Sequence, residues 1–169
     1  MNDFEKKKLK EIALYILSKT KGVDIYHLLK ILYFAEKKHL LNWGCSMVGL
    51  NFQAWEHGPV QPELYRSVKQ DKEFNNLEED ASSVIFAVRE PDMDYITDSY
   101  RECLDESILE NYNLSFSQLR EKSHDSAWEE AYNSDSKVMS ILSIAKAAGA
   151  NDGMMEYIQE MSDFEKAFC

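Results

Sequence analysis

The segment from Ile25 to Trp43 constrains the fold more than any other part of the chain. Asp24 is a suitable helix N-cap before it, and the residues up to Gly44 are typical of a helix end. The charged residues, Lys30, Glu36, Lys37 and Lys38, fall mostly on one side of the expected helix. The other side is a broad apolar face at helical spacing: Ile25, Leu28, Leu29, Leu32, Tyr33 and Leu40. A long helix with such a face has to be covered by other elements, so we expect it at the centre of the core.

Helical patterns also dominate the rest of the sequence. A first helix is expected from Asp3, as its N-cap, to Lys21-Gly22. Another begins at Pro62, because proline suits a first helical turn, and extends to Lys69. Further helices are expected from Thr97 or Asp98 to Tyr112, after Ser115, around Trp128 to Tyr132, from Ser136 to Ala148, and from Asn151 or Asp152 to about Phe168.

Short β elements are predicted at two places. Residues 45–55 tolerate an extended or hairpin-like conformation, and Gly58-Pro59 is interpreted as a turn after them. Residues 84–88 are rich in β formers and are expected to pair with residues 93–96, whereas 71–83 is predicted to be a loop. The sequence therefore predicts a mainly α fold: a single compact helical domain of about seven or eight helices with one or two short β-hairpin elements.

Composition narrows the class of protein. The 169 residues, 44% of them hydrophobic, are enough for one domain with a real core. A net charge of -11 disfavours non-specific binding to nucleic acid and favours a positively charged partner. No apolar run approaches the ~20 residues that span a bilayer, so no membrane partner is expected. The three cysteines, Cys45, Cys103 and Cys169, show no pairing pattern, which indicates reduced thiols and a cytoplasmic protein.

One stretch of twelve residues, Ala54 to Tyr65, combines side chains that constrain burial with residues that constrain the backbone. It holds Trp55, His57, Gly58, Pro59, Pro62, Glu63 and Tyr65. An ordinary surface loop needs no such combination, so the stretch is predicted to fix a particular surface. Further along, His124 and Trp128 share a helix face if their segment is helical. They either fill the core and satisfy nearby backbone, or support the surface formed by the earlier stretch.

No catalytic, metal or cofactor motif accompanies this stretch. The sequence lacks a G-x-S-x-G elbow, a reactive-cysteine signature and the glycine-rich phosphate-binding motifs. The four histidines form no close ligand pair, and His39 and Cys45 are too loosely spaced for a metal motif. We therefore predict no catalytic residue, no metal and no cofactor, and interpret the chain as a binding protein rather than an enzyme.

Two signatures resemble a known family. The first comprises Lys30-Ile31-Leu32-Tyr33-Phe34-Ala35, His39, Gly44 and Ala54-Trp55-x-His57-Gly58-Pro59-Val60-x-Pro62-Glu63-Leu64-Tyr65. It is similar to the Panacea antitoxin domain, the SocA-like family, whose members are also described as GepA-like phage-associated proteins. Leu119 with Ser123-His124-x-x-x-Trp128 resembles the second signature of that family. The resemblance covers about Lys10 to Tyr132. The stretch Gly49-Leu50-Asn51-Phe52 departs from the acidic pattern of many members, and residues 135–169 match no signature.

The resemblance implies a cytoplasmic bacterial or phage-borne antitoxin that neutralises a cognate protein toxin, encoded nearby, by direct binding and without catalysis. One member of the family acts instead as an adaptor that delivers its toxin to a protease. The implied domain covers residues 1–134, and residues 135–169 are expected to form a helical extension packed on it. The implied partner-binding or signature residues are Trp55, His57, Gly58, Pro59, Pro62, Glu63, Tyr65, His124 and Trp128.

Three alternatives stay open from the residues alone. The chain could be an unrecognised hydrolase that uses His57 or His124, which requires a serine, cysteine or carboxylate beside the imidazole. It could be a DNA-binding regulator, although the charge of -11 argues against direct contact with nucleic acid. The sequence is also compatible with a homodimer.

Overall fold

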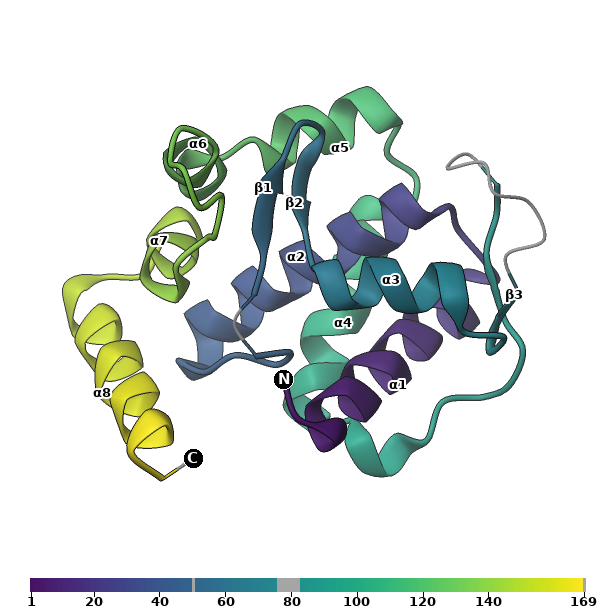
Figure 1. Ribbon diagram of the computed structural model, residues 1–169, viewed down its shortest axis with the longest axis horizontal. Helices are drawn as coiled ribbons and strands as arrows, with labels where there is room; N and C mark the ends of the chain where they lie inside the picture. Colours follow the sequence, from purple (N-terminus) through teal and green to yellow (C-terminus); the bar gives the residue numbers. More distant parts are fainter. Residues whose placement is uncertain (50, 76–82, 169) are drawn as a thin grey trace.

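The computed structural model describes residues 1–49, 51–75 and 83–168. Within these residues the chain forms eight α-helices, one 3-10 helix and two small antiparallel sheets of two strands each, which confirms the predicted fold class (Figure 1). The predicted loop at 71–83 lies largely outside the described residues, as does the thiol of Cys169.

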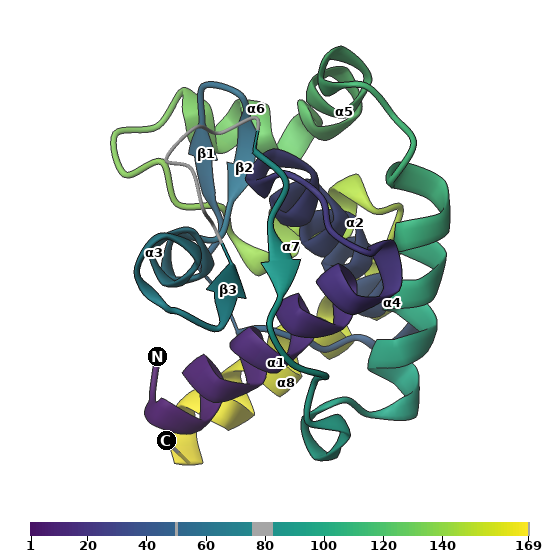
Figure 2. The same ribbon diagram turned by 90° about the vertical axis from the view of Figure 1, so that its right-hand side faces the viewer.

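The long apolar helix α2 (Ile25–Trp43) is central, as predicted. It packs against α1 (Asp3–Thr20), α3 (Pro62–Gln70), α4 (Asp98–Asn111), α5 (Phe116–Ser123) and α7 (Ile141–Ala147), so that it is covered on nearly every side. Figure 2 shows α4 flanking α1 and α2 on one side, with α3 on the other. Lys30 and Glu36, placed on the charged side of this helix from the sequence, are nevertheless buried, with exposed fractions of 0% and 1%. A helix surrounded by other helices leaves no solvent side for these two residues.

Helix starts agree closely with the capping residues in the sequence. The side chains of Asp24, Thr97 and Ser115 each accept a hydrogen bond from the backbone N–H three residues on, as expected for N-caps. The first helix differs by one residue, because Asn2 rather than Asp3 is its N-cap and forms a reciprocal capping box with Glu5.

The β1–β2 hairpin is the element that shapes the surface of interest. Strands β1 (Gln53–Trp55) and β2 (Gly58–Val60) pair with Gln53 opposite Val60 and Trp55 opposite Gly58. The turn therefore falls on residues 56–57, and the prediction of a turn at Gly58-Pro59 is wrong. Gly58 adopts a φ of 117°, which a residue with a side chain rarely adopts, and this allows the strand to begin directly after so short a turn.

A connecting segment lies along the outer edge of β1. The Ala54 N–H donates to the Lys137 carbonyl at 2.8 Å, and the Met139 N–H donates to the Phe52 carbonyl at 2.9 Å. The predicted helix from Ser136 is consequently wrong at its start: it begins at Ile141 with Ser140 as N-cap. These hydrogen bonds to β1 take the place of the helical hydrogen bonds that the backbone of residues 137–139 would otherwise need.

The second sheet also differs from the predicted pairing. Strand β4 (Phe86–Ala87) pairs with β3 (Phe74–Asn75), not with residues 93–96. Met93–Tyr95 instead forms the 3-10 helix η1, whose N-cap is Asp92. A half-buried ion pair holds the segment between them against α1, because the partly exposed Arg89 binds the buried carboxylate of Glu11 at 2.7 Å.

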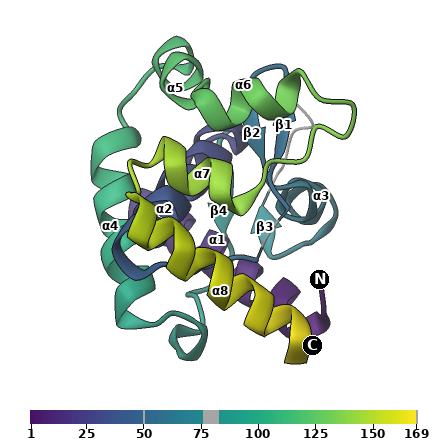
Figure 3. The same cartoon turned by 90° about the vertical axis from the view of Figure 1, so that its left-hand side faces the viewer.

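The last three helices follow one another along one edge of the molecule. They are α6 (Ser126–Tyr132), α7 and α8 (Asp152–Phe168), and Figure 3 shows α8 crossing the outer face of the helical core. Helix α7 contacts both α2 and α6, and α8 buries Ile158 to 1% exposure. No helix among the described residues combines the length and the apolar character needed to cross a membrane.

Candidate functional site

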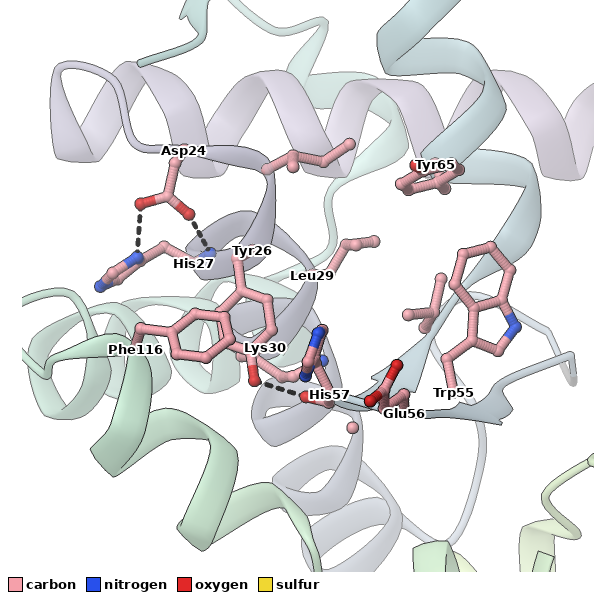
Figure 4. A pocket seen from close by; sticks show the side chains of 13 residues that line it. Asp24, Tyr26, His27, Leu29, Lys30, Trp55, Glu56, His57, Tyr65 and Phe116 are labelled. Carbon is pink, nitrogen blue, oxygen red and sulfur yellow. Dashed lines mark hydrogen bonds and ion pairs between the residues drawn. The ribbon is translucent and has the colours of Figure 1, made fainter. Parts of the chain in front are cut away.

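A cavity of about 630 Å³ opens between the start of α2, the β1–β2 hairpin, α3 and α5. We call it the aromatic cavity. It is lined by Asp24, Ile25, Tyr26, His27, Leu29, Lys30, Trp55, Glu56, His57, Gly58, Val60, Tyr65 and Phe116. Figure 4 shows two groups of side chains, with Trp55 and Tyr65 at one end and Tyr26, Phe116 and His57 at the other. Three separate regions of the sequence, residues 24–30, 55–65 and Phe116, therefore build one site.

Ring contacts set the shape of this cavity. Trp55 and Tyr65 meet edge to face, with their ring centroids 5.1 Å apart. At the other end the Tyr26 and Phe116 rings are 4.2 Å apart, and His57 meets Phe116 edge to face at 5.4 Å. The Tyr26 hydroxyl also donates a hydrogen bond to the main-chain oxygen of His57. These contacts tie the hairpin turn to α2 and α5, so the walls are held by packing.

Lys30 lies beneath the hairpin with no exposed surface. Its ammonium donates to the Pro59 carbonyl at 2.8 Å and lies 4.5 Å from the centroid of the Tyr26 ring. Burial lowers the pKa of Lys30 to about 7, because the charged form loses its hydration. Gly58 makes room for this side chain, since a Cβ there would lie 2.7 Å from the Lys30 Cε.

Asp24 and His27 form an ion pair at the edge of the cavity. The His27 Nδ1 lies 2.7 Å from an Asp24 oxygen, and its Nε2 lies 2.6 Å from the Leu114 carbonyl. The hydrogen bond to Asp24 raises the pKa of His27, while burial opposes it. Burial is the largest single effect on Asp24 and acts to raise its pKa, but the hydrogen bonds and charge of His27 together outweigh it and lower that pKa. Because both ring nitrogens have acceptors, His27 joins α2 to the start of α5 and is not free to act as a base.

His124 and Trp128 stand behind the hairpin. Their rings are stacked with centroids 3.6 Å apart, and the Trp128 indole N–H donates to the Trp55 carbonyl at 2.8 Å. The Nε2 atom of His124 is buried and has no hydrogen-bond partner among the described residues. Burial, followed by the charges of Arg120 and Lys30, lowers the pKa of His124 and favours its neutral form. Both residues thus support the hairpin from behind, outside the cavity lining.

The signature residues predicted from the sequence lie in different parts of the structure. Trp55, His57, Gly58 and Tyr65 line the cavity, and Pro59 contributes the carbonyl that holds Lys30. Pro62 occupies the first turn of α3, and Glu63 is paired with Arg66 on the same helix, away from the cavity lining.

Sequence reasoning missed the opposite wall, which consists mainly of Tyr26, Lys30 and Phe116. The i, i+4 spacing of Tyr26 and Lys30 places them on one face of α2 and is the signal that could have found them. No local pattern marks Phe116, whose place depends on how α5 packs.

The described residues contain no evident catalytic arrangement. In this part of the chain, no hydrogen bond joins the ring of His57 or His124 to a serine, a cysteine or a carboxylate. No group of three histidine, cysteine or acidic side chains has metal-binding geometry within the described ranges. Cys45 and Cys103 are free thiols, as expected, and burial raises the pKa of both above the ordinary value of a thiol.

An open cavity with mostly aromatic walls and a few convergent polar groups has the usual form of a binding site. The chain belongs to the SocA-like antitoxin family: the pattern of the family described as "Antitoxin SocA-like, Panacea domain" matches residues 28–129. Antitoxin SocA of Caulobacter vibrioides (strain NA1000 / CB15N) is 31% identical over 121 residues, covering 67% of this chain and 63% of that protein. The match thus spans less than two thirds of the relative's length. No solved structure matches the chain significantly.

Proposed function

We propose that this protein is an antitoxin that binds a cognate protein toxin directly in the cytoplasm, with the aromatic cavity as its binding site. The observation that carries the proposal is the position of Trp55, His57 and Tyr65. These three residues of the family signature lie at the lining of an open cavity instead of inside the core. Trp55 keeps 37% of its surface exposed at the mouth of this cavity, so its ring is accessible to a partner.

The proposed binding mode uses two physical contributions. Exposed aromatic side chains provide affinity, because tryptophan and tyrosine supply large contact areas at little cost in conformational entropy. The net charge of -11 accelerates the encounter with a toxin that carries a basic region. Neither contribution requires a reaction catalysed by the antitoxin.

The signature residues take different parts in this proposal. Trp55, His57 and Tyr65 contact the toxin. Gly58, Pro59 and Pro62 fix the backbone, and Glu63 complements the N-terminal end of the α3 dipole. His124 and Trp128 support the hairpin. We further propose that residues 135–169 extend the domain of residues 1–134, an assignment supported by the hydrogen bonds from the 137–139 segment to β1.

Co-expression with the product of the neighbouring gene tests the proposal. The wild-type chain should form a complex with that product and restore growth. Trp55→Ala and Tyr65→Ala should each weaken the complex by roughly 10- to 100-fold, as truncation of an aromatic anchor does. Phe164→Ala is the matched control, because Phe164 is 59% exposed on α8, outside the residues that line the cavity. Folded cavity variants that still bind and rescue like the wild type would contradict the assignment.

The same experiment separates a neutralising antitoxin from a proteolytic adaptor. Direct neutralisation leaves the half-life of the toxin unchanged or longer, whereas delivery to a protease shortens it. We expect no shortening. A shorter half-life that requires an intact cellular protease would replace neutralisation by the adaptor mechanism.

A further inference from the structure

Lys30 is a buried amine without a buried anion beside it. Its side chain has no exposed surface, and no carboxylate lies within ion-pair distance of its ammonium among the described residues. The acidic side chains that line the aromatic cavity do not pair with Lys30. Asp24 accepts hydrogen bonds from the ring and the backbone N–H of His27, and Glu56 is exposed. An unpaired buried charge costs several kcal/mol, of the order of the largest single-residue effects on stability.

Three neighbouring residues hold the Lys30 ammonium beside the cavity. An ammonium has three N–H donors, and the Pro59 carbonyl accepts one of them. The Tyr26 ring lies on another side, at 4.5 Å. Gly58 leaves room for the Lys30 Nζ, because a Cβ at this position would lie only 3.0 Å from that atom. A glycine, a carbonyl and an aromatic ring therefore surround one amine in the wall of the cavity.

We propose, on the basis of the proposed function, that the aromatic cavity receives an acidic side chain of the toxin next to an aromatic or apolar residue, and that Lys30 binds its carboxylate. The apolar residue lies between the ring pairs Trp55–Tyr65 and Tyr26–Phe116. The carboxylate takes the donors of Lys30 that the Pro59 carbonyl leaves open. Since Lys30 has no exposed surface in the free protein, the proposal requires the cavity wall to open as the carboxylate enters.

Two effects select the toxin in this arrangement, one acting at long range and one acting on contact. The acidic surface of the antitoxin attracts a basic toxin, while the cavity demands a carboxylate at one position of that toxin. A basic protein without the carboxylate would leave Lys30 unpaired on binding and would lose affinity. Lys30 thereby contributes to the choice of partner and not merely to the strength of binding.

A pH dependence follows from the proposal. A carboxylate favours the ammonium form of Lys30, so binding takes up protons wherever the free amine is partly neutral. The burial that lowers the pKa of Lys30 to about 7 places this range above neutrality. Affinity should be level below pH 7 and fall as pH rises above it.

The titratable and charged groups near Lys30 are Asp24 and Tyr26 of α2, Glu56 and His57 of the hairpin, and Arg120 and His124 at the end of α5. Contributions of groups that do not interact with Lys30 cancel when the profile is taken as a difference from Lys30→Met; His124 is the exception, because burial, Arg120 and the charge of Lys30 together lower its pKa.

Partner affinity of lysine variants is the first test. Lys30→Met should weaken the toxin complex by about tenfold or more and abolish the fall of affinity above pH 7. Its unfolding midpoint in urea should equal or exceed that of the wild type, because an apolar chain replaces a buried charge. Lys38→Met is the matched control on the same helix: Lys38 pairs with Glu106 and Glu110, outside the residues that line the cavity. Wild-type affinity in Lys30→Met would overturn the proposal.

A small probe tests the intact protein without any substitution. 3-Phenylpropionate carries an aromatic ring and a carboxylate, and 3-phenylpropionamide is its neutral counterpart. The acid should shift the NMR signals of the Lys30 side chain and compete with the toxin, whereas the amide should bind at least about tenfold more weakly. Equal binding of acid and amide would overturn the role of Lys30. Binding of the acid without competition would overturn the assignment of the carboxylate to the toxin.

The outcomes also distinguish this inference from the proposed function. If Trp55→Ala and Tyr65→Ala abolish binding while Lys30→Met does not, the cavity binds the toxin without a carboxylate contact. If none of the three affects binding, the toxin binds elsewhere and both proposals fail.

Discussion

At Gly58, backbone conformation and packing both require a residue without a side chain. Its φ is 117°, and an added Cβ would lie 2.6 Å from the Ser123 Oγ and 2.7 Å from the Lys30 Cε. We expect Gly58→Ala to lower the free energy of unfolding by about 2–4 kcal/mol, measured by urea denaturation. Gly149→Ala is the matched control, because Gly149 has a φ of 97° but no atom within 4 Å of its added Cβ. Equal losses in both variants would show that the contacts at Gly58 contribute nothing.

The ion pair of Asp24 and His27 gives the protein a predictable dependence of stability on pH. The pKa of His27 is raised above its ordinary value of 6.5, so its stabilising contribution is complete below that pH and lost as pH rises through the raised pKa. Asp24 has a lowered pKa, so its contribution is present above pH 3.8 and lost as pH falls through the lowered value. The pair therefore stabilises the fold most between about pH 4 and pH 6.5.

Urea unfolding of His27→Gln at several pH values tests this dependence. The variant should be less stable than the wild type at pH 5.5, and the difference should shrink toward pH 8.5. His124 offers a contrast, because burial lowers its pKa and its protonation at low pH therefore costs stability. The His124→Gln variant should change the pH dependence in the opposite sense. A difference at His27 that does not vary with pH would show that the pair is not ionic.

At the scale of elements, the sequence predicts best what neighbouring residues determine. The periodicity of α2 and the caps at Asp24, Thr97 and Ser115 are local, and the structure has them where expected. The segment before Ile141 shows the limit, since its helical pattern is overridden by hydrogen bonds to β1, more than 80 residues away. Strand β4 likewise pairs differently from the prediction, because its partner is β3, which lies in the segment predicted to be a loop.

The candidate site divides in the same way. The hairpin wall with Trp55, His57 and Tyr65 was predictable, because its residues are close together in the sequence. Lys30 was placed only on the charged side of the helix, since periodicity cannot show that elements cover both sides of α2. Phe116 reaches the cavity only through the packing of α5, which no local pattern encodes.

The hydrogen bond from Trp128 to the Trp55 carbonyl connects α6 to the hairpin and can be removed with little loss of packing. Trp128→Phe keeps an aromatic ring to stack on His124 but lacks the indole donor. We expect a loss of about 0.5–1.5 kcal/mol in stability, with faster hydrogen exchange of the hairpin amides. Trp43→Phe, at the far end of α2, is the control and should leave hairpin exchange unchanged. Unchanged exchange in Trp128→Phe would mean that the hairpin does not depend on this bond.

On the scale of the whole molecule, α8 is attached to the core through few side chains. Ile158 is its most buried apolar residue, whereas Phe164 and Phe168 on the same helix are 59% and 76% exposed. Gly44, at the end of α2, allows Tyr157 to approach, since a Cβ there would lie 2.4 Å from the Tyr157 ring. A cavity of about 160 Å³, lined by residues that include Cys45 and Ile158, separates this helix from the loop after α2. The reactivity of Cys45 therefore reports whether α8 is docked.

Ile158→Asp should release α8 from the core, because a carboxylate cannot be buried there without a partner. In a Cys169→Ser background, the rate at which Cys45 reacts with a thiol reagent should rise about tenfold or more, while Cys103 stays protected in the core. Phe164→Asp introduces the same charge at an exposed position of α8 and should leave the rate unchanged. A cooperative loss of the whole fold in Ile158→Asp would show that α8 is part of the folding core. An unchanged rate in a stable Ile158→Asp variant would show that α8 does not control access to Cys45.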